Sequence, residues 1–215
     1  MDTSDLLIRG LQAIDCPCSE EQVGAFMLLL SELKKWNKTY NLTALKTDED
    51  IIIKHFLDSL LFIKALPDAA RRLADAGSGA GFPGIPLKIA RPDLDITLVE
   101  SSRKKTAFSR HIIRLLKLTG IHVLEQRLEH LGKEYEKCFD LIVSRAAFSI
   151  TDFIKRACPY VNEQGSLILN KGPKVSEEVK AFEAAPCTGL IKDILRLPLP
   201  FLKAERNLIV LSCRM

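Results

Sequence analysis

One glycine-rich segment constrains the fold of this chain more than any other feature of the sequence. Residues 73–84 read as a short strand, a turn and the start of a helix, with the sequence LADAGSGAGFPG. Gly77, Gly79 and Gly81 can each adopt a positive φ at no steric cost, and without a Cβ they let a ligand lie directly on the backbone. Pro83 suits the first position of a helix, where its missing N–H is not needed. The segment therefore predicts a strand–loop–helix unit that holds a ligand.

Two acidic residues flank this loop at the ends of predicted strands. Asp75 closes the strand before the loop, where a carboxylate can bind a cationic group. Glu100 ends the next predicted strand, at residues 96–99. A carboxylate at this second place accepts hydrogen bonds from ribose hydroxyls in nucleoside-binding α/β folds. The two acids together predict a nucleoside ligand that also carries a positive charge.

Two cofactors compete for such a loop. Residues 79–84 match the G-x-G-x-x-G pattern of dinucleotide-binding folds. Read from Asp75, the same residues resemble the first motif of S-adenosylmethionine-dependent methyltransferases, whose donor has an ammonium and a sulfonium but no pyrophosphate. Asp75 suits the cationic donor better. A nicotinamide-dependent oxidoreductase is the alternative, although the chain has no Tyr-x-x-x-Lys of a hydride site and no evident second domain.

Composition places the chain among ordinary globular proteins. Its 215 residues are 47% hydrophobic and 27% charged, enough for one large domain or one domain with a small cap. No stretch is long and apolar enough to span a membrane, and the acidic N-terminus is no signal peptide. The six cysteines show no C-x-x-C pair, so we expect reduced thiols, no metal site and no disulfide framework. These features predict a cytoplasmic protein.

Charge is divided unevenly along the chain. Residues 1–70 carry 7 basic and 11 acidic side chains, whereas residues 71–215 carry 24 basic and 16 acidic ones. The half with the glycine loop is therefore the basic half. A basic surface around a nucleoside site suggests a polyanionic substrate such as nucleic acid.

The order of predicted elements defines the fold class. Residues 1–70 have helical periodicity and form an N-terminal extension that we expect to pack on a domain of residues 71–215 as one compact unit. From Leu73 onward strands and helices alternate, which predicts an α/β fold with a mostly parallel seven-stranded sheet and helices on both faces. The predicted strands are 73–76, 96–99, 121–124, 139–143, 166–170, 190–197 and 207–212, and the helices are 83–91, 103–118, 150–158 and 175–185.

The predicted helix at residues 103–118 has a basic stripe. Arg103, Arg110, Arg114 and Lys117 fall on one side at about 100° per residue. The stripe has two interpretations, a solvated face of an amphipathic helix or a row of RNA-phosphate contacts.

Further polar residues follow strands or share a helix face. Arg145 comes just after the apolar strand 139–143, and Lys171 follows strand 166–170. Ligands of open α/β sheets bind beyond such strand ends, so both are candidates for the site. Arg145 has the alternative of an ion pair with a loop acid. His55 and Asp58 lie three residues apart on a predicted helix, where they either orient a substrate group or form a structural pair.

Several stretches taken together resemble the glucose-inhibited division protein B family, the bacterial 16S (small-subunit) rRNA guanine-N7 methyltransferases. The resemblance covers nearly the whole chain, and it is carried by residues 35–43 (KWNKTYNLT), 55–59 (HFLDS), 75–87 (DAGSGAGFPGIPL), 143–146 (VSRA), 171–172 (KG) and 205–208 (ERNL). Glu100 stands where many members have aspartate, which keeps the carboxylate for the ribose.

The resemblance implies a Rossmann-like, S-adenosylmethionine-dependent methyltransferase that methylates N7 of a guanine in 16S rRNA. The implied partner is 16S rRNA, the small ribosomal subunit or its precursor, with no membrane partner, and we expect a monomer. Implied donor contacts come from Gly77, Phe82, Leu128, Glu129 and Arg145. Arg145 and Lys171 would hold the guanine or its phosphates, with His55 and Asp58 on the pocket wall. A non-enzymatic rRNA-binding or assembly protein is a third alternative, against which the intact Asp75, glycines and Glu100 argue.

Overall fold

A seven-stranded sheet forms the centre of the molecule. The computed structural model describes residues 2–145, 147–184 and 189–213. The strand order is β3-β2-β1-β4-β5-β7-β6, in which neighbours from β3 to β5 are parallel and β7 is antiparallel to both β5 and β6. The strands are β1 (Arg72–Ala76), β2 (Asp95–Val99), β3 (Ile121–Leu124), β4 (Phe139–Arg145), β5 (Val161–Lys171), β6 (Gly189–Pro198) and β7 (Glu205–Cys213). This arrangement confirms the predicted mostly parallel α/β sheet.

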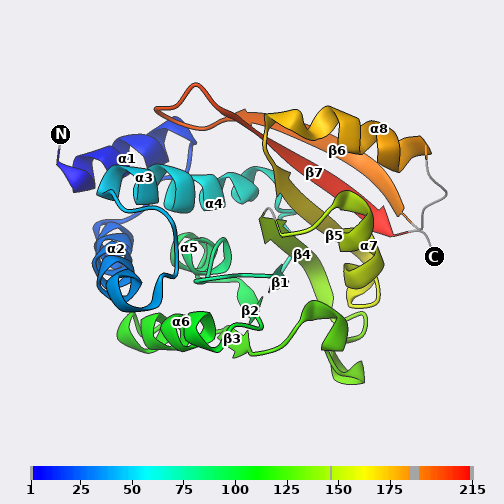
Figure 1. The fold of residues 1–215 in the computed structure, drawn as a ribbon, viewed down its shortest axis with the longest axis horizontal. Coiled ribbons are helices and arrows are strands. Elements are labelled where there is room, and N and C mark those ends of the chain that lie inside the picture. Colours follow the sequence, from blue (N-terminus) through cyan, green and yellow to red (C-terminus); the bar gives the residue numbers. More distant parts are fainter. Residues whose placement is uncertain (1, 146, 185–188, 214–215) are drawn as a thin grey trace.

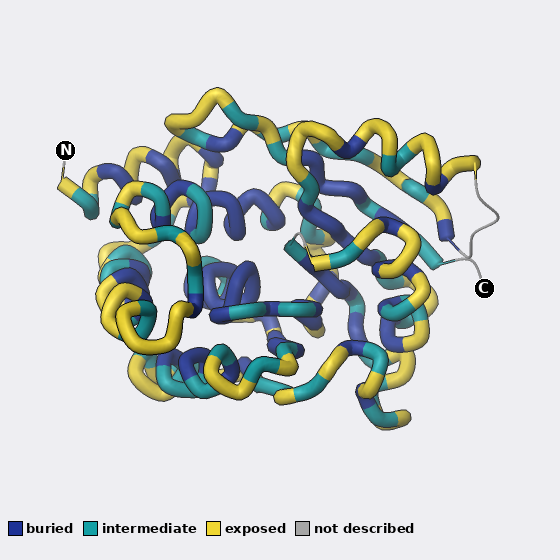
Figure 2. The backbone as a smooth tube through the Cα atoms, viewed as in Figure 1, coloured by how far each residue is buried: buried dark blue, intermediate teal, exposed yellow. Residues whose placement is uncertain are grey.

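Helices cover both faces of the sheet (Figure 1). One face carries α5 (Gly84–Ala90), α6 (Arg103–Leu115) and the N-terminal helices, and its buried side chains form one hydrophobic cluster. The other face carries α7 (Ile150–Ala157) and α8 (Ser176–Ala184) over a second cluster. Short 3-10 turns lie at Leu128–His130, Lys133–Tyr135 and Pro173–Val175. Figure 2 shows the central strands buried and the outward helix surfaces exposed. Among the described residues, no helix is both long and apolar enough to cross a membrane.

The N-terminal segment is helical, as predicted. It consists of α1 (Thr3–Ala13), α2 (Glu20–Tyr40) and α3 (Asp48–Ile51), which continues through a π-helical turn at Ile52–Leu57, α4 (Asp58–Leu60) and a 3-10 turn at Leu61–Ala65. Ser19 and Gln22 form a capping box at the start of α2. The Gln22 amide also donates to the carbonyl oxygen of Ile89 in α5 at 2.7 Å. Phe26 of α2 packs on Phe56 with ring centroids 5.4 Å apart. The core therefore runs without a break from α1 to the sheet.

Two boundaries differ from those predicted by three residues or more, each for a local reason. Helix α6 ends at Leu115 rather than at residue 118, because Lys117 adopts the left-handed conformation (φ 51°) and the Leu118 N–H returns to the Ile113 carbonyl. A residue in the left-handed conformation followed by such a return bond is the Schellman motif, which commonly ends helices. Strand β5 begins at Val161 rather than at 166. Its pairing with β4 starts at Phe139 and is then interrupted by an irregularity. The residues of β5 that follow Val161 are polar, so the apolar pattern that predicts a strand is missing there.

The cysteine expectation is wrong for one pair. Cys158, at the end of α7, and Cys213, at the end of β7, form a disulfide with Cα atoms 5.7 Å apart. These cysteines are 55 residues apart, and only the packing of α7 against the sheet brings them together. Cys16, Cys18 and Cys138 are free thiols, and Cys187 lies outside the described residues.

The continuous core predicts that the N-terminal helices unfold together with the sheet. Phe26 is fully buried, so Phe26→Ala should lower the free energy of unfolding by about 3–5 kcal/mol. Urea unfolding followed by far-ultraviolet circular dichroism and by tryptophan fluorescence should still give one transition. Leu28→Ala on the same helix is the control, because Leu28 is 38% exposed and should change stability by no more than about 0.5 kcal/mol. Separate transitions for the two probes would contradict the single unit.

Candidate functional site

The glycine loop between β1 and α5 has the backbone conformation that its sequence predicts. Gly77, Gly79 and Gly81 have φ values of 70°, 58° and 90°. The N–H groups of Gly77 and Ser78 donate to the carbonyl oxygen of Val99, at 2.9 and 3.1 Å, which folds the loop over the end of β2. A Cβ built on Gly79 would meet nothing within 4 Å. The backbone of Gly79 is therefore open to a ligand, as the sequence predicts for this loop.

Two carboxylates accept hydrogen bonds from backbone N–H groups in and next to the loop. Asp75 Oδ2 accepts a hydrogen bond from the Gly84 N–H at 2.7 Å. Glu100 Oε2 accepts from the Gly79 N–H at 2.9 Å, and its Oε1 accepts from the Ser102 N–H at 2.8 Å. Both acids thus fix the shape of the loop before any ligand arrives, and a carboxylate has further lone pairs for one.

The Asp75 carboxylate is fully buried and only half satisfied. Its Oδ1 has no hydrogen-bond partner among the described residues. Burial raises the pKa of Asp75 to about 7, although the Gly84 N–H and the Arg145 charge act in the opposite direction. A buried acceptor without a partner is uncommon and indicates a group that a ligand completes. A cationic group beside Asp75 would stabilise its ionised form.

A pocket of about 360 Å³ opens beside the loop and contains three of the residues implied for the donor, Gly77, Leu128 and Glu129, together with the predicted Glu100. It lies between the ends of β1 and β2 and the start of α7, and its volume is in the range of small-ligand sites. Glu129 of this pocket forms an ion pair with Arg156, so its side chain is held in place. The lining residues are Gly77, Val99, Glu100, Ser101, Gln126, Arg127, Leu128, Glu129, Ala147, Phe148, Ser149, Asp152 and Arg156.

A second group of predicted residues surrounds Phe82 of the loop, which is itself 4% exposed. The His55 ring stacks on the Phe82 ring at 4.5 Å with an interplanar angle of 11°. The Arg145 guanidinium lies over the same ring, 5.5 Å from its centroid. Arg145 is the last residue of β4, two positions beyond Val143, which pairs with Asp75 of β1. The structure therefore brings Phe82, His55 and Arg145 together at the glycine loop.

Arg145 is less exposed than a side chain at the rim of the cleft would be. Its side chain is 17% exposed. Nη1 donates to the Lys54 carbonyl oxygen at 2.8 Å and to Asp58 Oδ2 at 3.4 Å, and Nη2 donates to His55 Nδ1 at 2.9 Å. Arg145 consequently joins β4 to the helical N-terminal segment, and it also has the ion pair considered as its alternative interpretation, with a helix acid rather than a loop acid.

His55 is held neutral with a defined tautomer. Burial and the neighbouring Arg145 charge lower the pKa of His55 to about 3. A guanidinium only donates hydrogen bonds, so Nδ1 must be the acceptor and Nε2 must carry the proton. Nε2 lies 2.8 Å from Thr43 Oγ1 and donates to it. His55 therefore connects Arg145 to the loop after α2 through hydrogen bonds at both ring nitrogens.

Asp58 is the acceptor at the centre of a second set of bonds. Its Oδ1 accepts from Arg206 Nε at 2.7 Å and from Asn170 Nδ2 at 3.2 Å, while Oδ2 faces Arg145. Arg206 is a residue of this centre that the sequence did not predict, since it precedes the last predicted strand (207–212). Because β7 runs antiparallel to β5, its first residues lie at the edge of the sheet where β4 and β5 end. This strand direction is what places Arg206 beside Asp58.

The remaining predicted residues lie around this centre. Lys171 Nζ donates to the Phe148 carbonyl oxygen at 2.6 Å and forms an ion pair with Glu178 at 3.0 Å, so it supports the pocket wall. Arg110 forms an ion pair with Glu125 at 2.8 Å. Within the described part of the chain, the other stripe residues Arg103, Arg114 and Lys117 form no ion pair, and all three are exposed.

The burial of Asp75 predicts a pH-dependent penalty on stability. Its pKa is about 7 in the folded protein and about 4 in the unfolded chain. Between these values the folded protein retains a proton that the unfolded chain loses, so stability falls as pH rises. Asp75→Asn removes this penalty. The free energy of unfolding of Asp75→Asn minus that of the wild type should therefore increase with pH, by up to about 1.4 kcal/mol per pH unit, and should stop increasing near pH 7. Urea unfolding at pH 5, 6, 7 and 8 measures this difference, and a constant difference would contradict the assignment.

Solved structures show the same fold. A SAM-dependent methyltransferase from Leishmania major superposes with a TM-score of 0.61 and 15% identity, covering 85% of this chain and 82% of that chain. A predicted O-methyltransferase, protein Atu636 from Agrobacterium tumefaciens, superposes with a TM-score of 0.55 and 24% identity over 73% and 78% of the two chains. The chain therefore has the Rossmann-like methyltransferase fold.

Sequence relatives extend over nearly the whole chain. "Ribosomal RNA small subunit methyltransferase G" of Geobacter sp. (strain M21) is 38% identical over 210 residues, which are 97% of this chain and 96% of that protein. The protein of the same name from Geotalea uraniireducens (strain Rf4) is 40% identical over 209 residues, 96% and 95% of the two chains. A family model described as rRNA small subunit methyltransferase G matches residues 22–209. The chain belongs to the rRNA small subunit methyltransferase G (GidB) family.

Proposed function

We propose that this protein transfers a methyl group from S-adenosylmethionine to N7 of one guanine in 16S rRNA. Membership of the rRNA small subunit methyltransferase G family, over residues 22–209, is the observation that carries the proposal. The methyltransferase sheet and the pocket beside its glycine loop agree with it. The nicotinamide-dependent oxidoreductase and the non-enzymatic rRNA-binding protein are not favoured by this family.

The residues present fit the donor. The unpaired Oδ1 of buried Asp75 suits the ammonium of the methionine part, and the open space above Gly79 suits its close approach to the backbone. Glu100 lies at the pocket wall, where it would accept hydrogen bonds from the ribose. Leu128 and Glu129 would border the adenine in the same pocket. When bound, S-adenosylmethionine supplies a methyl group that its sulfonium already activates for nucleophilic attack.

The acceptor needs orientation rather than a general base. Guanine N7 carries a free lone pair and loses no proton before it attacks. Catalysis can therefore rest on holding N7 in line with the methyl group, and well-oriented reactions reach effective molarities of about 10⁵–10⁸ M. His55, neutral and bonded on both sides, is suited to positioning and not to proton transfer.

Arg145 is the group that we assign to the guanine. His55, Asp58 and the Lys54 carbonyl take up part of its fork of donors. Its remaining N–H groups can contact guanine O6, which lies beside N7 on the same edge of the base. Lys171 acts through Phe148, whose carbonyl oxygen it binds at the pocket.

The proposal includes the setting of the reaction. The substrate is 16S rRNA within the small ribosomal subunit or its precursor, and the exposed Arg103, Arg114 and Lys117 of the α6 region contact its phosphates. The protein acts in the cytoplasm as a monomer. Size-exclusion chromatography with light scattering tests the monomer, and transfer to naked 16S rRNA, to precursors and to finished subunits compares the substrates.

Calorimetry and RNA mapping test the function itself. Titration of the protein with S-adenosylmethionine and with NAD should show binding of the first and none of the second. Small subunits that lack the modification should gain N7-methylguanine at one position when incubated with protein and donor. Binding of NAD alone would support the oxidoreductase, and RNA binding without donor binding would support the assembly protein.

The first prediction from this proposal concerns Gly79. Gly79→Ala places a methyl group in the open space over the loop, at a backbone φ of 58°. Donor affinity should fall at least about tenfold, since ligand atoms must give way, while the positive φ itself costs stability of about 1–2 kcal/mol. Gly24→Ala in α2 is the control, because its Cβ also meets nothing within 4 Å but the helix gains stability of about 1 kcal/mol. Unchanged donor affinity in a folded Gly79→Ala protein would show that the donor lies elsewhere.

The second concerns Arg145. Arg145→Lys keeps the charge but cannot reproduce the fork that reaches the Lys54 carbonyl and His55 together. Loss of a charge-assisted contact of about 1.5–3 kcal/mol should slow single-turnover transfer roughly ten- to a hundredfold. Because the side chain is largely buried, the melting temperature should also fall, so transfer is measured well below it, with the donor affinity as a check on the pocket. Normal transfer by this variant would leave Arg145 with a structural role only.

A further inference from the structure

Tyr40 is an exposed aromatic residue at the end of α2. Its side chain belongs to the last residue of the helix, and Asn41 ends the helix in the left-handed conformation with φ 49°. Tyr40 is 44% exposed, while its ring lies 5.3 Å from the Trp36 ring at an angle of 37°. Trp36 in turn packs on Phe108 and His111 of α6. The tyrosine ring is therefore supported from beneath and open to solvent.

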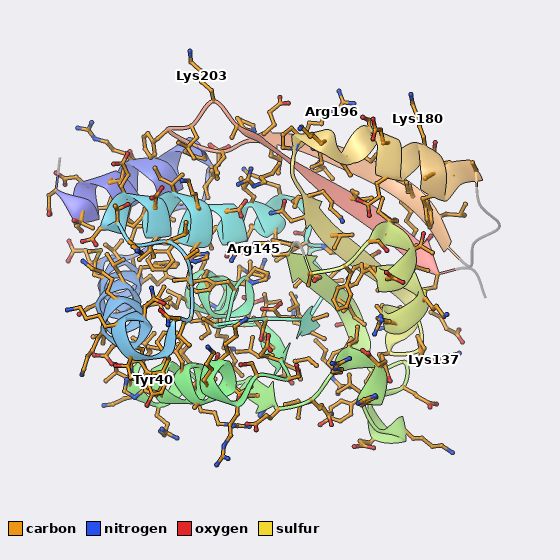
Figure 3. All side chains as sticks on the ribbon, viewed as in Figure 1. Tyr40, Lys137, Arg145, Lys180, Arg196 and Lys203 are labelled. Carbon is orange, nitrogen blue, oxygen red and sulfur yellow. A yellow bond between two sulfur atoms is a disulfide. The ribbon has the colours of Figure 1, made fainter. Side chains whose placement is uncertain are left out.

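Positive charge surrounds this ring on the side of α6. Lys104 Nζ donates to the Tyr40 carbonyl oxygen at 2.8 Å and joins the end of α2 to the first turn of α6. Figure 3 shows Tyr40 next to α6. Lys104 and its neighbour Arg103 are exposed, and within the described ranges neither forms an ion pair, although the Arg103 charge helps to lower the pKa of Glu125. At about 100° per residue, Arg114 lies on the same side of α6 as Arg103. Tyr40 thus lies at one end of a basic surface made of Arg103, Lys104 and Arg114.

This surface connects to both halves of the site. The Thr43 N–H donates to Asn37 Oδ1 at 2.9 Å, which fixes the loop that follows Tyr40. Thr43 Oγ1 accepts from His55, the residue that holds Arg145. At the other end, the N-cap of α6 is Ser102, whose N–H binds Glu100 of the donor pocket. Hydrogen bonds, together with short stretches of backbone, therefore link the region around Tyr40 to His55 and Arg145 on one side and to Glu100 on the other.

An open aromatic ring beside unpaired cations matches one partner chemistry. Proteins hold unpaired RNA by stacking bases on aromatic side chains and by binding the backbone phosphates with basic ones. We infer that Tyr40 and Lys104 form a docking site for an unpaired RNA segment next to the target guanine, with one base stacked on Tyr40 and a phosphate on Lys104. The inference deepens the proposed function and rests on it.

The single tryptophan of the chain provides a direct readout. Trp36 lies against Tyr40, so a base that stacks on Tyr40 should change Trp36 emission. The probe is single-stranded oligoadenylate of twelve nucleotides, titrated into the protein saturated with S-adenosylhomocysteine. Tyr40→Ala should weaken its binding about fivefold to about 150-fold, the range measured for one stacked base. Tyr40→Phe keeps the ring and should restore most of the affinity.

Charge removal and matched controls separate this site from general attraction. Lys104→Gln should lower the slope of log affinity against log salt by about 0.7, the value for one phosphate contact to a single strand. Phe201→Ala and Lys180→Ala are the controls, because Phe201 is also an exposed aromatic residue (49%) and Lys180 an exposed lysine on α8 (Figure 3). Both control variants should bind as the wild type does. Melting temperatures and donor affinities of all variants should stay unchanged.

Transfer to small ribosomal subunits distinguishes the two levels of the inference. Wild-type protein that forms N7-methylguanine supports the proposed function, and Tyr40→Ala should then raise KM more than it lowers kcat. If the wild type transfers but Tyr40→Ala binds oligoadenylate and subunits normally, or if Tyr40→Phe is as weak as Tyr40→Ala, the docking site is overturned. If the wild type binds RNA through Tyr40 but transfers no methyl group, the proposed function fails and the docking site stands.

Discussion

The arrangement of the site depends on the hydrogen bonds that the Arg145 guanidinium donates. Arg145 ends β4, yet its bonds go to the Lys54 carbonyl, His55 and Asp58 in the helical N-terminal segment. A buried charge is costly unless its donors are satisfied, and removing one partner of such a group costs more than the pair contributes. The N-terminal helices must therefore lie where they supply these acceptors. The same requirement explains why Asp58 also gathers Arg206 and Asn170.

The donor side of the cleft follows a different principle. Beside three positive-φ glycines lies a buried, half-satisfied carboxylate, an unfavourable feature that the surrounding fold maintains. Because Asp75 and Glu100 already hold the loop through the Gly84 and Gly79 N–H groups, little reorganisation remains for the moment of binding. A prepared site of this kind spends less of the binding free energy on ordering. On the other side of the cleft Arg145 donates to His55 and Asp58, whereas the Oδ1 atom of Asp75 has no partner among the described residues and leaves room for a cationic group.

Sequence reasoning predicted what local chemistry determines and missed what only tertiary packing creates. Alternating glycines between a strand and a helix require positive φ, so the loop, Asp75 and Glu100 were predictable, as were the seven strands from their apolar runs. The role of Arg206 and the Cys158–Cys213 disulfide were not, because their partners lie 148 and 55 residues away. Burial of Arg145 was equally hidden, since a residue after a strand gives no sign of the helix that will cover it.

The protonation state of His55 connects the geometry to the kind of chemistry the cleft can perform. With Nδ1 accepting from Arg145 and Nε2 donating to Thr43, the ring has no nitrogen left to exchange a proton with a substrate. Its pKa near 3 keeps it neutral throughout the physiological range. An acceptor that had to lose a proton first would find no base in His55, whereas guanine N7 needs none. The His55 ring instead fixes the position of Arg145 relative to Thr43, in the loop after Tyr40. Under the two proposals, RNA held at the end of α2 and the guanine beside Arg145 would be positioned by one connected set of side chains.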